Sequence, residues 1–264
     1  MLEPFQQQTD INLALTEWEH RVPGLKAGFT THNSEQERLN MGLYTNDQPD
    51  KVINNRRQLA SRVGFPLESW VAGEQIHQTK THFVTEKDKG KGAADYTASL
   101  KGTDGLITHK TGILCTAVFA DCVPLFFLDP VTGYIGLAHA GWKGTVARMG
   151  QKMVEAFQAR GADPAAMLVA IGPCISRDVY EVDEEVIRHI PSALREKTVT
   201  SLDDHRFLVD LKQLNIEILL QQGIFRHNID VTNYCTFRDE SLFFSHRRSR
   251  GNTGRMLGYI GYEK

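Results

Sequence analysis

The chain has 264 residues, of which 41% are hydrophobic and 23% charged, a composition typical of a globular protein with a substantial buried core. Its 30 basic and 32 acidic residues give a net charge of -2. This balance argues against a general attraction to nucleic acid or to an anionic membrane, so a small molecule is the favoured class of partner.

The cellular compartment is suggested by what the sequence lacks. The N-terminal segment has no basic stretch followed by an apolar one, and no apolar run approaches the roughly 18 residues of a membrane span. The four cysteines (115, 122, 174 and 235) are scattered and form no CxxC pair, which fits reduced thiols. We therefore expect a cytoplasmic protein without a membrane partner.

In the first half of the chain, apolar patterns predict a strand over 25–31 and a helix over 49–63. Short strands over 70–76 and 81–85 follow. Residues 87–102 are rich in Lys, Gly, Ala and Ser, which predicts a surface excursion within one domain. A second polar stretch, over 196–206, predicts the same.

The middle of the chain is rich in β-type runs, followed by the clearest helix. Thr145 is a candidate N-cap, an apolar stripe follows it, and Gly161 stands where a helix often ends. Before this helix, strands are predicted over 105–108, 112–119, 123–128 and 134–138.

The remaining elements complete the fold prediction. Helices are expected over 183–190 and 212–222, and strands over 167–171, 207–211 and 256–262. Strands come in runs and helices are interspersed irregularly. This pattern predicts an α+β fold with mixed, largely antiparallel sheets, formed by one domain over 1–264.

Three residues in distinctive local sequences are the strongest functional candidates. Cys122 in FADCVP and His139 in AHAGWKGT each follow a predicted strand, and His77 in GEQIHQ follows a shorter one. We take Asp121 and Pro124 as signs that the chain turns beside Cys122. One thiolate and two imidazoles suit zinc with one coordination position left open, as a catalytic site requires.

Each of these residues also has a structural interpretation. A free cysteine is often a small core residue, and a histidine after an apolar strand is often a hydrogen-bonded structural group. His77 lies in a polar setting typical of a protein surface. The separations of 45 and 17 residues match no compact zinc-finger pattern.

Two other chemistries could use the same atoms. Cys122 could be a nucleophile activated by His139, as in cysteine hydrolases. The set could also bind copper, but no two of the ten histidines are two positions apart, as the His-x-His pairs of multicopper oxidases are. Copper oxidase chemistry is therefore the least favoured of the three.

Several basic residues are candidates for binding phosphate, since guanidinium groups hold phosphate through two hydrogen bonds. Each could equally be part of a solvated basic surface. No complete phosphate-loop motif is present. The candidates are Arg56, Lys143, Arg247 and Arg248, with Arg57, Arg250 and Arg255 beside them in the sequence.

Nine segments carry a family resemblance, which covers residues 29–262. The chain resembles the laccase-domain purine nucleoside phosphorylase family, also called multicopper polyphenol oxidase-like or YfiH-type, and in particular its bacterial single-domain members. One difference is Lys143, where the family often has arginine. The segments, in order, are LNMGLYTND, NNRRQL, EQIH, GTDGLIT, FADCVPLFF, GLAHAGWKGT, AIGPCI, YEVD and FFSHRR.

The resemblance implies a layered α/β/β domain similar to that of a toxin deamidase with a Cys-His pair. It implies that His77, Cys122 and His139 are both the metal ligands and the catalytic residues, with zinc as the ion and copper as the alternative. The implied partners are purine nucleosides (adenosine, inosine, guanosine and methylthioadenosine) and inorganic phosphate, and adenosine deamination is the implied second activity.

Two further functions stay open. Some relatives are described as peptidoglycan editing factors, which implies an amidase that removes L-serine from a UDP-muramoyl precursor. A metal-stabilised binding module without turnover is the non-enzymatic alternative. The sequence does not indicate an oligomeric state.

Overall fold

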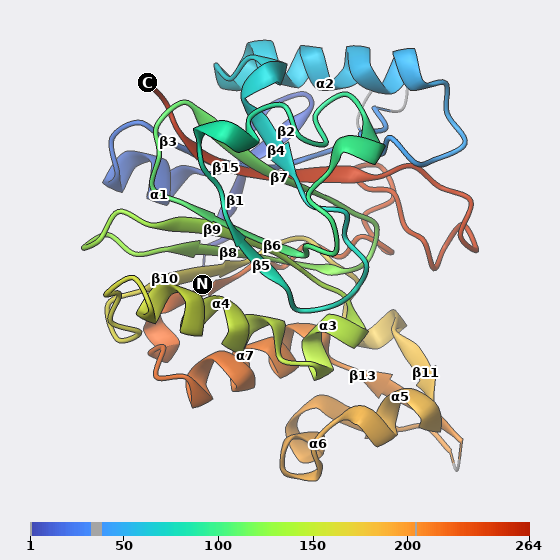
Figure 1. The fold of residues 1–264 in the computed structure, drawn as a ribbon. Helices are drawn as coiled ribbons and strands as arrows, with labels where there is room; N and C mark the ends of the chain where they lie inside the picture. The colour runs from blue at the N-terminus through green and yellow to red at the C-terminus, as the bar shows by residue number, and fades with distance from the viewer. Residues whose placement is uncertain (1, 33–38, 204) are drawn as a thin grey trace.

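The computed structural model describes residues 2–32, 39–203 and 205–264. Two six-stranded sheets lie face to face, and helices cover the outer side of each (Figure 1). Helix α2 (Pro49–Val63) lies over the first sheet, and helices α3 (Trp142–Val146), α4 (Met149–Gln158) and α7 (Leu211–Gln221) lie over the second. The predicted α+β class with mixed sheets is confirmed.

The first sheet is antiparallel except at one edge, where β4 and β7 run parallel. The short helix α1 (Thr16–Arg21) lies in sequence between its second and third strands. In spatial order its strands are β1 (Phe5–Thr9), β2 (Asn12–Leu15), β3 (Leu25–Thr30), β15 (Met256–Tyr262), β7 (Ile113–Phe119) and β4 (Trp70–Ala72).

The second sheet has a parallel pair at each edge and antiparallel pairs between them. Its two central neighbours, β8 and β9, are buried along their whole length, as is β7 of the first sheet. Burial on both faces explains why these strands read as nearly continuous apolar runs, broken by Thr116 in β7 and His139 in β9. In spatial order the strands are β14 (Ile229–Val231), β10 (Leu168–Ile171), β8 (Val123–Leu128), β9 (Ile135–Ala140), β6 (Gly105–Thr108) and β5 (Thr81–Phe83).

A small three-stranded sheet lies beyond one end of the helical layer, with two short helices beside it (Figure 1). Both neighbours of its central strand run antiparallel to it. The helices are α5 (Glu184–His189) and α6 (Ser192–Thr198), and the strands, in spatial order, are β11 (Glu181–Asp183), β13 (Arg206–Val209) and β12 (Val199–Ser201).

The core between the two large sheets is built from aromatic and branched side chains of both. Phe29 and Phe119 of the first sheet pack with a ring separation of 5.6 Å, and Phe126 and Leu137 of the second sheet belong to the same cluster. This packing fixes the sheets against each other, so the strand ends beside them are held in place.

The prediction of one continuous helix from Thr145 to Gly161 is wrong in two respects. First, the structure has two helices there, α3 and α4. Arg148 adopts a left-handed conformation, with φ 65°, between α3 and α4. Second, Thr145 is not an N-cap: it is buried within α3, and its hydroxyl donates to the Ala140 carbonyl. Gly161 does have the expected left-handed conformation.

Other boundaries also differ. The strand predicted over 70–76 ends at Ala72, because Gln75 and His77 have positive φ and turn the chain away from the sheet. Strand β8 has the predicted bounds 123–128, so Pro124, taken as a sign of a turn beside Cys122, lies within the strand. The polar stretch 196–206 contains the end of α6, strand β12 and the start of β13.

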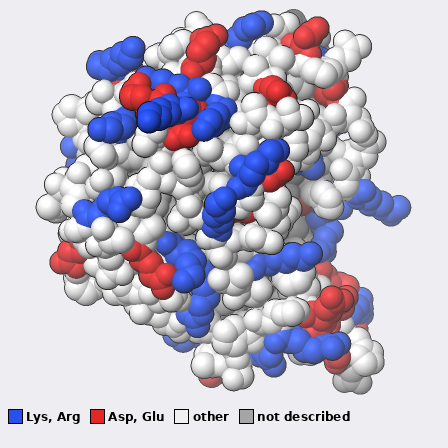
Figure 2. Space-filling view, in the orientation of Figure 1, with Lys and Arg blue, Asp and Glu red and all other residues white. Residues whose placement is uncertain are grey.

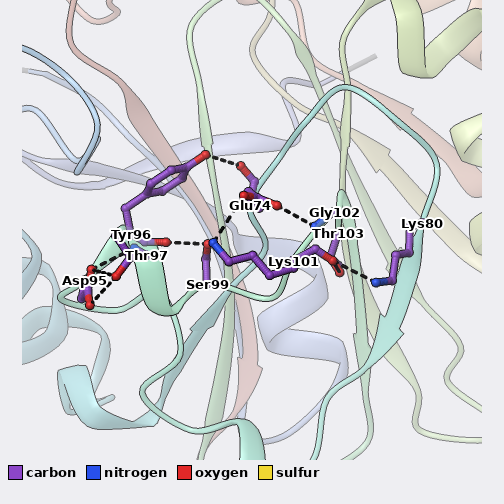
Figure 3. A network of polar contacts seen from close by, with 9 residues as sticks. All are labelled: Glu74, Lys80, Asp95, Tyr96, Thr97, Ser99, Lys101, Gly102 and Thr103. Carbon is purple, nitrogen blue, oxygen red and sulfur yellow. Dashed lines mark hydrogen bonds and ion pairs between the residues drawn. The ribbon is translucent and has the colours of Figure 1, made fainter.

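The predicted excursion over 87–102 is tied back onto the sheet. Figure 3 shows Tyr96 donating its hydroxyl proton to the Glu74 carbonyl, while the Glu74 carboxylate accepts from the Gly102 amide and from Lys101. These contacts fold the segment over the end of β4 and fix the position of Tyr96.

Basic and acidic side chains are interspersed over the face seen in Figure 2. All four cysteines are free thiols. No helix in the described part of the chain has the length and apolar character that a bilayer crossing requires.

Candidate metal centre

The structure brings together three side chains from distant parts of the sequence. Cys122 directly precedes β8, and His139 is next to last in the neighbouring β9, opposite Pro124. His77 lies on the turn between β4 and β5. Their ligand-type atoms all lie within 4.8 Å of one another, and 4.0 Å separates Cys122 Sγ from His77 Nε2.

The donor set fits a metal ion in both chemistry and spacing. Zn–S bonds of about 2.3 Å and Zn–N bonds of about 2.0 Å, arranged tetrahedrally, place ligand atoms roughly 3.3–3.6 Å apart. The distances here are slightly longer, so small side-chain rotations would bring the three atoms to one ion. That these residues bind a metal remains a prediction.

A buried carboxylate fixes the orientation of one imidazole. His139 Nδ1 lies 2.9 Å from Asp104 Oδ1, and the Asp104 side chain is completely buried. A carboxylate can only accept, so Nδ1 carries the proton and Nε2 is the nitrogen available to a ligand. Sequence analysis assigned Asp104 no role, although it lies in GTDGLIT, one of the segments that carry the family resemblance.

Gly141 allows the three side chains to approach so closely. A β-carbon at this position would lie 2.8 Å from Cys122 Sγ and 3.0 Å from His77 Cδ2. Any larger residue would therefore push the thiol and the imidazole apart. The glycine in AHAGWK thus has a steric role beside the centre.

The charges of the cluster are coupled in the metal-free protein. Burial raises the pKa of the Cys122 thiol, but the His139 charge and hydrogen bonds from His139 and His77 outweigh it and lower that pKa to about 6. Burial lowers the pKa of His139, while the Cys122 thiolate and Asp104 outweigh it and raise that pKa to about 9. At neutral pH the pair is therefore thiolate and imidazolium.

Asp121 connects the Cys122 segment to the C-terminal part of the chain. Its backbone has φ 81°, and its carboxylate accepts hydrogen bonds from the Thr236 and Ser245 hydroxyls and from the Arg247 amide. These contacts fix the turn that presents Cys122. They also place Arg247 beside it.

The cluster opens into a pocket of about 550 Å³. Its walls combine aromatic and basic side chains from segments that lie far apart in the sequence. The aromatic residues are Tyr44, Tyr96, Trp142 and Tyr180, and the basic residues are Lys143, His246, Arg247 and Arg255. Sequence reasoning assigned no role to the three tyrosines, although Tyr44 and Tyr180 lie in segments that carry the family resemblance.

The four predicted phosphate ligands fall into two groups. Lys143 and Arg247 are exposed and line the pocket. Arg56 is buried, and its guanidinium donates to the carbonyls of Met41, Gly92 and Ala93. Arg248 likewise donates to the carbonyls of Thr236, Phe237 and Phe243. These two side chains direct their donors to the backbone rather than to the pocket.

Comparisons with known proteins agree with this architecture. The chain is 39% identical over 273 residues to a Bacillus subtilis protein named purine nucleoside phosphorylase YlmD, covering 99% of this chain and 98% of the relative. It is 42% identical over 247 residues to the YlmD of Geobacillus stearothermophilus, covering 90% of each.

Solved structures match equally well. The crystal structure of YlmD from Geobacillus stearothermophilus superimposes with a TM-score of 0.94 at 39% identity and covers all of both chains. A Bacillus licheniformis hypothetical protein, YfiH, gives a TM-score of 0.95 at 38% identity over 99% of this chain and 100% of the other. Residues 26–263 match the family model described as multi-copper polyphenol oxidoreductase laccase, and the chain belongs to that family.

Proposed function

We propose that this protein is a zinc-dependent purine nucleoside phosphorylase that acts on adenosine, inosine, guanosine and methylthioadenosine, with adenosine deamination as a second activity. The observation that carries the proposal is the convergence of His77, Cys122 and His139 on one pocket with aromatic and basic walls. Two relatives named purine nucleoside phosphorylase YlmD support the phosphorylase part of this proposal.

The pocket offers groups suited to both substrates. Aromatic side chains such as Tyr180 and Tyr96 provide faces for a purine ring. Lys143 and Arg247 provide positive charge for phosphate. In phosphorolysis a phosphate oxygen bonds to the ribose C1′ while the C1′–N9 bond breaks, and the purine leaves with the bonding electrons and takes up a proton.

Three atoms would hold the ion: His77 Nε2, Cys122 Sγ and His139 Nε2. Bound zinc would supply a Lewis acid with one open position. Asp104 keeps the His139 ring oriented, and Gly141 leaves room for the thiol. Copper remains the alternative ion, since divalent copper binds such sites more tightly than zinc. Among the residues that the structure describes, one cluster of three ligand atoms is found, and it would hold one ion, so the polyphenol oxidase function remains the less favoured one.

The test is a product assay on the purified protein. Incubated with inosine and phosphate, it should release hypoxanthine and ribose 1-phosphate, and elemental analysis should find about one zinc per chain. Cys122→Ala should abolish both results. Cys115→Ala is the matched control because Cys115 is a buried thiol in β7 outside the cluster. Absence of product from the zinc-loaded native protein would contradict the proposal.

A second candidate function is supported by the same geometry. Cys122, His139 and Asp104 form a row of thiolate, imidazolium and carboxylate, the arrangement that activates a cysteine nucleophile. Such a hydrolase could remove L-serine from a UDP-muramoyl-serine precursor. Release of serine that persists after chelation and stops on alkylation of Cys122 would favour this activity over the metal-dependent one.

We further propose that residues 1–264 act as one domain in the cytoplasm. The pocket is lined by Tyr44, in the first third of the chain, and by Arg255, directly before the last strand β15. The residues that form it therefore span nearly the whole chain. Limited proteolysis that produced a stable, active fragment would contradict the single-domain proposal.

A further inference from the structure

Asp104 contacts two of the three proposed ligands at once, although they lie on different elements. Its carboxylate oxygen Oδ1 lies 2.9 Å from His139 Nδ1 and 3.1 Å from the His77 amide nitrogen. Its backbone carbonyl also accepts a hydrogen bond of 2.8 Å from the His139 amide. The strand that carries His139 and the turn that carries His77 therefore meet at this residue.

The other carboxylate oxygen completes a set of three consecutive backbone donors. Oδ2 accepts from the amides of Ile76 and Gln78, at 3.1 and 3.0 Å, on either side of the His77 amide. Three amide protons directed at one buried charge hold the turn in a single conformation. The Asp104 side chain is completely buried, so water does not compete for these contacts.

The turn needs such support because its backbone is strained. Gln75 and His77 have φ values of 56° and 61°, in the left-handed region that residues with side chains rarely adopt. Strained conformations of this kind persist where surrounding contacts hold them, and they concentrate at functional sites. Asp104 accepts hydrogen bonds from three backbone amides of this turn, and it is therefore well placed to keep His77 directed at Cys122.

We propose that Asp104 is a positioning residue that presets His77 and His139 for metal binding. Through Oδ1 it fixes the His139 ring with Nε2 free, and through both oxygens it holds the turn that presents His77. This inference rests on the metal centre of the proposed function. It adds that the affinity for the ion depends on a carboxylate that does not touch the ion.

The experiment compares two buried aspartates. Asp104→Asn keeps the size of the side chain but replaces one acceptor oxygen by an amide NH2 group, which donates and cannot accept from the surrounding N–H groups. Asp88→Asn is the matched control, because Asp88 is also buried, accepts from the Thr85 amide and lies 3.3 Å from a histidine, His82. Asp88 lies outside the pocket.

Affinities for zinc and cobalt are measured in each purified protein by competition with a chelator. The sulfur-to-cobalt absorption band reports binding at Cys122, and urea unfolding of the metal-free proteins reports stability. Asp104→Asn should bind both ions about 10–100-fold more weakly, the range typical of lost outer partners of metal-bound histidines. Asp88→Asn should lower stability and leave both affinities within about twofold of wild type, because it touches no ligand.

Unchanged metal affinity in Asp104→Asn would overturn the inference, and so would an equal loss of affinity in Asp88→Asn. If Asp104→Asn does not fold, the zinc-loaded wild type provides the test by nuclear magnetic resonance. Its spectra should show the His139 proton on Nδ1 and coordination through Nε2, and the reverse arrangement would overturn the inference. Failure of the wild type to bind either ion would instead contradict the proposed function.

Discussion

Two kinds of segment supply the candidate ligands, and they differ in how they are held. Cys122 and His139 lie beside or within neighbouring strands whose pairing fixes their separation. His77 is exposed and lies on a turn with a left-handed backbone. The strands would keep their geometry because they are buried in the core, whereas the turn depends on the amide contacts to Asp104. The centre thus combines a rigid half, the strands with Cys122 and His139, with a supported half, the His77 turn held by Asp104.

Replacing one histidine from each half gives the largest expected effects. His139→Ala and His77→Ala should both weaken zinc binding more than about 100-fold, because each removes a ligand rather than an outer partner. Only His139→Ala should also cost stability, by about 2–3 kcal/mol, since it leaves the buried Asp104 without one partner. His77→Ala should stay within about 0.5 kcal/mol of wild type, as exposed substitutions usually do.

These effects are measured by chelator competition for zinc and by urea unfolding of the metal-free proteins. Equal losses of stability in the two variants would show that the division into a rigid and a supported half is wrong.

Gly141 tests whether the two halves must approach as closely as they do. In Gly141→Ala the new methyl group would contact Cys122 and His77 at sub-van der Waals distances. A displacement of about 1 Å costs on the order of 100-fold in rate, so kcat/KM should fall by about that factor. Gly144→Ala is the control, because its methyl group would meet no atom closer than 3.4 Å. Similar activity in both variants would contradict the steric role.

The coupling between Cys122 and His139, which lie on neighbouring strands or beside them, can be tested alone by alkylation of the metal-free protein. The Cys122 thiolate should react with iodoacetamide with a midpoint near the pKa of about 6, well below the ordinary thiol value of 9.0. The sign follows from the charges: the thiolate is lost as pH falls through that value, while His139 stays protonated up to about 9. His139→Ala should move the midpoint upward. Mass spectrometry of the Cys122 peptide follows the rate, and a midpoint near 9 in wild type would contradict the coupling.

The smallest effect is expected at the pocket wall, where two adjacent arginines differ. Arg247→Lys should raise the KM for phosphate about 3–10-fold with little change in kcat. Lysine keeps the positive charge but lacks the planar guanidinium that holds phosphate through two hydrogen bonds. Arg248→Lys should leave that KM unchanged and cost about 1–2 kcal/mol of stability, since it gives up hydrogen bonds to backbone carbonyls. Steady-state kinetics and urea unfolding separate the two, and a KM change in Arg248→Lys alone would reverse the assignment.

The sequence predicted those parts of the fold that have strong local signals. Buried strands such as β7 and β8 appear as nearly continuous apolar runs, and α2 has an apolar stripe and a glycine at its C-terminal end. The class of fold followed from their order. The break at Arg148 was missed, because a left-handed residue inside an amphipathic pattern leaves no mark on its periodicity.

The site was predicted unevenly for a related reason. Cys122 and His139 were identified from residues around them, but the role of Asp104 depends on contacts with residues 26 to 35 positions away. Arg56 and Arg248 were candidates for phosphate binding because guanidinium groups hold phosphate through two hydrogen bonds. The carbonyl groups that surround them come from other segments, so only the folded chain identifies their partners.

Arg56, in its buried position, joins two segments that each contribute a tyrosine to the pocket. It binds the Met41 carbonyl near Tyr44 and the carbonyls of Gly92 and Ala93 near Tyr96, and the two tyrosine rings pack 5.0 Å apart. The two tyrosine-bearing segments therefore form one connected part of the pocket wall, separate from the strands beside or within which Cys122 and His139 lie. Changes in these two segments could alter which molecules enter the pocket while leaving the reactive centre intact.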